Sequence, residues 1–82
     1  MNNHELLDRI ELNPRVLTGK PVIKGTRLSV QFIVGLLAKG ATHQQILDEY
    51  TYLKTEDIYA CLLFASQVLD SNPFVLLEKS FS

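Results

Sequence analysis

The segment from Gly19 to Val30 constrains the fold more than any other part of the chain, and it reads Gly-Lys-Pro-Val-Ile-Lys-Gly-Thr-Arg-Leu-Ser-Val. Its two glycines permit positive φ angles that other residues resist. Pro21 donates no backbone hydrogen bond, so it suits the start or the edge of a strand. The pair Val22-Ile23 between these turn residues predicts a short strand. We therefore expect a compact bend or hairpin that packs on the helix following it.

Strand signals also precede this segment. Ile10-Glu11-Leu12 alternates between apolar and polar residues and is stopped by Asn13-Pro14, which predicts a short strand. Val16-Leu17 is a further strand candidate before the turn at Gly19. Residues 1–28 therefore form an N-terminal β segment with a basic loop rich in Gly and Pro.

Helix signals dominate the rest of the chain, and helices are expected at about residues 30–39, 43–50 and 55–70. Ser29 and Thr42 are favourable N-caps, and Gln45 completes a capping box with Thr42. Gly40 suits the C′ position that ends the first helix. Thr55 is the predicted cap of the last helix. Residues 29–70 are thus a three-helix core, followed by an apolar tail at 71–82 within the same single domain.

Several short motifs occur in a recognisable order, namely Asn13-Pro14, Gly19 to Val30, Gly40, Ile46 to Tyr50 and Glu56 to Ile58. In this order they resemble the bacterial and archaeal family called "domain of unknown function 433". The similarity covers about residues 8 to 69. Two positions depart from the family pattern, since Thr51 stands where Pro is frequent and Lys54 where Thr is frequent. Both lie in the turn between the last two helices.

The resemblance implies an α+β, mainly helical fold, in which a homeodomain-like three-helix bundle follows a short β segment. Members of the family are regarded as antitoxins, often paired with a toxin of the PIN-like nuclease type. The resemblance therefore implies an antitoxin of a type II toxin–antitoxin pair that neutralises such a toxin by binding. In one version of this hypothesis, the antitoxin also binds its own operator DNA through a helix-turn-helix.

Charge is distributed unevenly along the chain, although its net value is only −1. Residues 1–39 carry six cations and three acids, a net of +3, whereas residues 40–82 carry two cations and six acids, a net of −4. Any bound phosphate should therefore meet the N-terminal half. Lys20, Lys24 and Arg27 are the densest cations there, and we assign them to DNA or anion binding. Alternatively, the two halves attract each other, and Arg27 forms an internal clasp with Asp57 or Glu49.

The last predicted helix fits DNA recognition poorly. A recognition helix needs exposed Arg, Lys, Asn or Gln near its N-terminus. Here Glu56, Asp57 and Tyr59 come first, followed by a nearly continuous apolar run. This pattern favours the alternative function, a protein-interaction subunit without DNA binding.

The apolar content of the first and last helices exceeds what so short a chain can cover, so a homodimer is expected. The tail adds further apolar residues, and Phe74, Leu76 and Leu77 are assigned to partner binding, in a groove of the toxin or as an added strand. The alternative is that the tail folds back over the first helix or the dimer seam.

Enzymatic and membrane functions find no support in the sequence. No run of about 18 apolar residues is present, and the N-terminus does not resemble a signal peptide. No nucleophile has an identifiable base, and neither His4 nor His43 has metal-ligand spacing to Cys61. Cys61, the single cysteine, is best interpreted as a core residue. We expect a cytoplasmic protein without a cofactor or metal, and an enzyme of unknown reaction is the weakest alternative.

Overall fold

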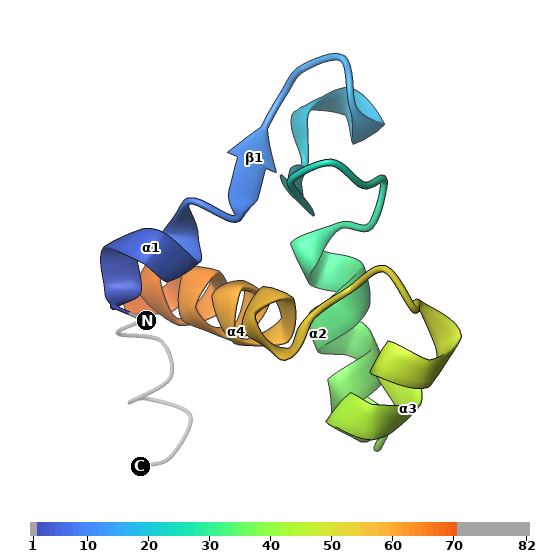
Figure 1. Ribbon diagram of the computed structural model, residues 1–82. Helices are drawn as coiled ribbons and strands as arrows, with labels where there is room; N and C mark the ends of the chain where they lie inside the picture. The colour runs from blue at the N-terminus through green and yellow to red at the C-terminus, as the bar shows by residue number, and fades with distance from the viewer. Residues whose placement is uncertain (1, 71–82) are drawn as a thin grey trace, which may run out of the picture.

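A two-stranded antiparallel hairpin and three main helices make up the fold (Figure 1), which confirms the predicted class. The computed structural model describes residues 2–70. Along the chain, its elements are α1 (Asn3–Leu7), β1 (Ile10–Leu12), a 3₁₀ turn (Leu17–Gly19), β2 (Pro21–Ile23), α2 (Val30–Ala38), α3 (His43–Glu49) and α4 (Thr55–Asp70). Within residues 2–70, no helix is both long and apolar enough to span a bilayer.

The hairpin forms where the sequence predicted two of its three strands. Ile10 pairs with Ile23, Glu11 with Val22, and Leu12 with Pro21. Val22 and Ile23 are buried, so this strand is anchored in the core. Pro21 is the first residue of β2, a position where its missing N–H costs no ladder hydrogen bond.

The predicted strand at Val16-Leu17 is wrong, because this stretch makes the turn between β1 and β2. Leu17 and Thr18 adopt positive φ angles of 48° and 54°. The amide of Gly19 donates to the carbonyl of Val16 at 3.0 Å, which closes the turn. Apolar and β-branched composition suggested a strand, but the reversal of the chain overrides that local preference.

The loop after β2 explains the Gly-Thr-Arg sequence. The amide of Ile23 donates to the carbonyl of Leu28 at 2.9 Å, and that of Thr26 donates to the carbonyl of Ile23 at 3.0 Å. Gly25 has a φ of +80°, as a turn of this kind requires at its third position. The Thr26 hydroxyl donates to the Ile23 carbonyl at 2.7 Å and accepts from the Leu28 amide at 3.0 Å. Arg27 follows this tight loop, and its side chain is exposed.

Two of the three predicted helix caps are confirmed. Ser29 Oγ accepts from the Phe32 amide at 2.9 Å, and Thr42 forms the predicted capping box with Gln45. Gly40 follows α2 with a φ of +99°. Thr55 is not a cap, because α4 begins at Thr55 itself. The Asp57 carboxylate, two residues further on, binds the Lys54 amide at 2.9 Å.

The sequence patterns did not predict α1. Asn2 and Glu5 form a capping box, in which Asn2 Oδ1 accepts from the Glu5 amide at 2.8 Å and Glu5 Oε1 accepts from the Asn2 amide at 3.1 Å. A helix of five residues is too short to show an apolar period, so this box was its only readable signal. α1 lies beside α4 (Figure 1).

The core lies where β2, α2, α3 and α4 meet. α2 and α4 pack against each other and supply most of its residues. Its buried members are Ile23, Val30, Ile33, Ile46, Leu53, Ile58 and Cys61. The loop between β2 and α2, which carries Arg27, lies on one side of this core, and the C-terminal half of α4 lies on another.

Candidate functional site

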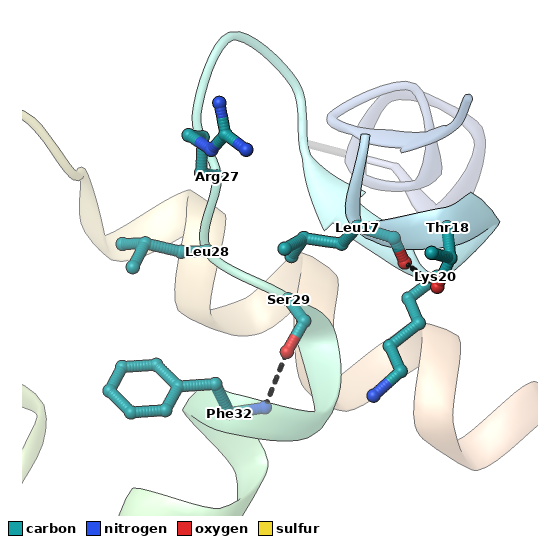
Figure 2. A pocket seen from close by; sticks show the side chains of 7 residues that line it. All are labelled: Leu17, Thr18, Lys20, Arg27, Leu28, Ser29 and Phe32. Carbon is teal, nitrogen blue, oxygen red and sulfur yellow. Dashed lines mark hydrogen bonds between the residues drawn. The ribbon is translucent and has the colours of Figure 1, made fainter. Parts of the chain in front are cut away.

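A surface rich in cations surrounds the N-terminus of α2. Lys20 and Arg27 line one hollow of about 540 Å³, together with Ser29 and Phe32 (Figure 2). An adjoining hollow of about 420 Å³ shares Lys20, Ser29 and Phe32 and extends to Lys39. Among residues 2–70, no acidic residue lines either hollow. We call the surface formed by Lys20, Arg27, Ser29, Phe32 and Lys39 the basic face.

Lys24, the third cation that we assigned to DNA or anion binding, lies apart from the other two. It lines a different hollow, whose other lining residues are Glu5, Asp8, Arg9 and Asp57. The structure thus brings Lys20 and Arg27 together on the basic face and places Lys24 beside carboxylates. Phosphate contacts from all three cations at one site are therefore not favoured by this arrangement.

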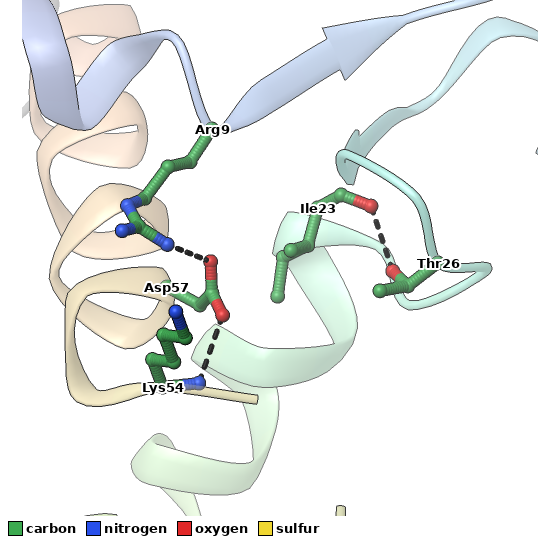
Figure 3. Close-up of polar contacts among 5 residues, drawn as sticks. All are labelled: Arg9, Ile23, Thr26, Lys54 and Asp57. Atoms are coloured by element: carbon green, nitrogen blue, oxygen red, sulfur yellow. Dashed lines mark hydrogen bonds and ion pairs between the residues drawn. The ribbon is translucent and has the colours of Figure 1, made fainter. Parts of the chain in front are cut away.

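A partly buried ion pair joins the N-terminal segment to α4 (Figure 3). Arg9 Nη1 donates to Asp57 Oδ1 at 3.0 Å, while Asp57 Oδ2 accepts from the Lys54 amide. The two side chains are 27% and 10% exposed. An internal clasp on Asp57 therefore exists, but its cation is Arg9 rather than Arg27. Arg27 forms no hydrogen bond or ion pair with any residue between 2 and 70.

The helix pair α3 and α4 presents little that suits DNA. The first turns of α4 are part of the core, since Asp57, Ile58, Ala60 and Cys61 are buried. Tyr59 is exposed there and Glu56 is partly exposed, while α3 exposes Asp48 and Glu49. Phosphates would meet carboxylates on this side of the domain.

An apolar groove lies between α2 and the C-terminal half of α4. We call it the α2/α4 groove, and its volume is about 480 Å³. Val30, Val34, Gly35 and Ala38 of α2 form one wall, and the other wall consists of Phe64, Ala65, Val68 and Leu69 of α4. Lys20, Pro21, Ser29 and Gln31 complete the lining.

The α4 wall of this groove continues a buried stripe of the helix. The stripe has helical spacing and consists of Asp57, Cys61, Phe64 and Val68. Cys61 is fully buried, Phe64 is partly buried, and Val68 is 46% exposed, with Leu69 beside it at 58%. The core-facing side of α4 therefore becomes more exposed toward the C-terminus of the helix.

The other side of the same helix end is apolar as well. A hollow of about 400 Å³ lies there, lined by Leu7, Ile10, Leu12, Phe64, Gln67 and Val68. Phe74, Leu76 and Leu77, which we assigned to partner binding, lie outside the described residues. The chain leads into them from Asp70, the last residue of α4 and the neighbour of Leu69 in the groove wall.

Cys61 is a core residue, as its place on an apolar helix predicted. It is fully buried, and burial, with a smaller contribution from the nearby Asp57 charge, raises the pKa of its thiol to about 12. Because the thiolate is the reactive form, this cysteine is held in an inert state. Between residues 2 and 70, no three His, Cys, Asp or Glu side chains are grouped closely enough to hold a metal ion.

We expect Cys61 to resist alkylation by iodoacetamide at pH 8 in the folded protein and to react readily in guanidinium. The raised pKa stabilises the folded state fully below the unfolded thiol pKa of about 8.5, and this contribution is lost as the pH rises toward 12. Mass spectrometry of timed samples measures the reaction. Rapid labelling of the folded protein would contradict the packing described for α4.

Comparison with known proteins supplies the family. A family model described as "Protein of unknown function (DUF433)" matches residues 10–65. The chain belongs to this family. Its fold is also similar to the crystal structure of a DUF433 member protein from Anabaena variabilis ATCC 29413, with 28% sequence identity and a TM-score of 0.73. That similarity covers 83% of this chain and 67% of the other. No curated protein matches the chain.

The match confirms the resemblance drawn from the Gly19 to Val30 motif and the motifs after it. The family description assigns no function, so the residues must carry the functional argument. Two surfaces of this DUF433 chain are available for that purpose, the α2/α4 groove and the basic face. They share Lys20 and Ser29 at their border.

Proposed function

We propose that this protein is the antitoxin of a type II toxin–antitoxin pair and that it binds a PIN-like nuclease toxin through the α2/α4 groove. The observation that carries the proposal is the exposed apolar surface at the last turns of α4, where Leu69 is 58% exposed in the groove wall. The resemblance to the family supplies the class of partner. The groove supplies the place where a protein partner gains most from burying apolar surface.

The position of the groove favours an extended contact with the toxin. Val68 and Leu69 occupy the last turn before Asp70, and the residues that follow include Phe74, Leu76 and Leu77. We assign the groove to binding an apolar element of the nuclease, and on sequence grounds we assign Phe74, Leu76 and Leu77 to the same partner.

Co-expression tests this function most simply. The tagged protein is produced together with the product of the adjacent reading frame, which we expect to be a PIN-like nuclease that slows growth when expressed alone. A stable complex on purification and restored growth are the expected results. Failure of the two proteins to associate would overturn the proposal, as would an adjacent product unrelated to nucleases.

The role of residues 73–82 can be tested by truncation after Asn72. We expect weaker toxin binding and a nearly unchanged melting temperature, because these residues serve the partner rather than the core. The opposite result, intact binding and a melting temperature lowered by several degrees, would mean that the tail covers its own domain. For a chain of this size, about 1 kcal/mol of lost stability lowers the melting temperature by about 4–8 °C.

Binding to operator DNA is the second candidate function, and the basic face favours it. Lys20 and Arg27 flank the N-terminus of α2, and no acid of the described part of the chain lines the same hollow. A gel-shift titration with the DNA upstream of the gene, repeated across a salt series, tests this function. The absence of a shift at low salt would mean that the protein does not bind its operator duplex and acts as an interaction subunit.

A further inference from the structure

We propose that the basic face binds single-stranded nucleic acid, with its phosphates at Lys20, Arg27 and Lys39 and one base stacked on Phe32. This inference goes beyond toxin binding and does not depend on it. The family description assigns no such site.

Continuity of the surface is the first argument. The two hollows that form the basic face share Lys20, Ser29 and Phe32, so the three cations border one connected surface. Figure 2 shows Phe32 projecting beside Leu28, with Arg27 and Lys20 on different sides of Ser29. A nucleic-acid backbone that follows this surface would pass one cation after another, and the lining residues described for it include no carboxylate.

An aromatic platform is the second argument. The ring of Phe32 is 42% exposed, and it meets Tyr50 edge to face with centroids 6.0 Å apart. Tyr50 in turn meets Tyr52 in the same manner at 6.4 Å, and Tyr52 is 61% exposed. Contacts of this kind fix the ring orientations. Exposed aromatic rings beside cations are what single-strand binding proteins use to stack bases.

The choice of a single strand over a duplex follows from the same residues. A ring can stack only on a base that is free of its neighbours, and a duplex keeps its bases stacked inside. Reading a duplex would require a helix in the major groove. The helix in the corresponding position, α4, has its first turns buried in the core. Phe32 therefore contributes to single-strand binding and not to duplex binding.

Fluorescence anisotropy with labelled oligomers of about 12 nucleotides, oligo-dT and oligo-U in separate arms, measures this binding directly. With three phosphate contacts, the logarithm of the association constant should fall with a slope of about −2 against the logarithm of salt between about 50 and about 300 mM. Comparing the two arms shows whether DNA or RNA is the better ligand.

Substitutions separate stacking from charge. Phe32→Leu keeps an apolar residue and should weaken binding about tenfold with the same salt slope. Lys20→Ala or Lys39→Ala should make the slope shallower by about 0.7. Lys24→Ala is the matched charge control, since Lys24 lies beside carboxylates away from the basic face, and Tyr59→Ala is the control for an exposed ring. Both controls should bind like the wild type.

Three results would overturn the inference. The first is equal or tighter binding of a duplex of the same length, which would make the surface a duplex phosphate site. The second is the absence of binding to either oligomer at low salt. The third is equal weakening by Lys20→Ala and Lys24→Ala, which would show that only net charge matters. Thermal melts confirm that each variant is folded, and the two lysine variants test the proposal independently of Phe32.

Discussion

Replacing Asp57 with alanine is expected to lower the free energy of unfolding by about 3 kcal/mol. One carboxylate holds two groups, the Arg9 guanidinium at 3.0 Å and the Lys54 amide at 2.9 Å. It is 10% exposed and sits in the first turn of α4, where a negative charge is also favoured by the helix dipole. Its loss leaves a partly buried cation unpaired and the start of α4 without its side-chain acceptor.

Chemical denaturation followed by circular dichroism measures this effect. Asp57→Asn keeps the shape and one acceptor oxygen, so it should cost about half as much, on the order of 1–2 kcal/mol. Arg9→Ala and the double variant of Arg9 and Asp57 complete a double-mutant cycle. We expect it to give a coupling energy between the two residues of at least about 1 kcal/mol. Glu56→Ala is the matched control, because no hydrogen bond or ion pair involves the Glu56 side chain within residues 2–70. Additive effects of Arg9 and Asp57 would contradict the described pair.

Most of the secondary structure could be predicted because residues close together in the sequence determine where the helices begin and end. Ser29, Thr42 and Gln45 act through bonds to amides three residues away, and such spacing can be read from the sequence. Where the rules failed, tertiary structure decided the conformation. Leu17 has strand propensity but lies in the turn between β1 and β2, and Thr55 lost the capping role to Asp57.

The candidate site was predictable only in part. Lys20 and Arg27 were identified from charge density, but the folding of the hairpin decides that they share a surface and that Lys24 does not. The Arg9–Asp57 pair joins residues 48 positions apart, and no local pattern indicates it. Phe32 lies on the apolar helix α2, and only the folded structure shows that its ring is 42% exposed.

Leu69→Glu is expected to weaken toxin binding by at least about 30-fold, the cost of losing a central interface residue. Leu69 is 58% exposed in the wall of the α2/α4 groove, so a glutamate there remains hydrated in the free protein. In the complex, the same carboxylate would be buried against apolar surface without a partner. The stability of the free protein should change little by comparison.

Leu62→Glu is the matched control, with the same chemical change on the same helix. Leu62 is 39% exposed and does not line the groove. Ala38→Glu places the same charge on the opposite wall of the groove, which α2 forms. If Leu69→Glu and Ala38→Glu both lose affinity for the toxin, a local effect on α4 cannot explain the result. Light scattering of each free variant records whether a second copy, rather than the toxin, occupies the groove.

Isothermal titration of the toxin with these variants tests the central claim most directly. Our account predicts that Leu69→Glu and Ala38→Glu lose most of the affinity, while Leu62→Glu binds like the wild type and all variants keep the same oligomeric state. Wild-type affinity in both groove variants would contradict it. A dimer that dissociates in the groove variants while toxin binding persists would also contradict it, because the groove would then join two copies of this chain.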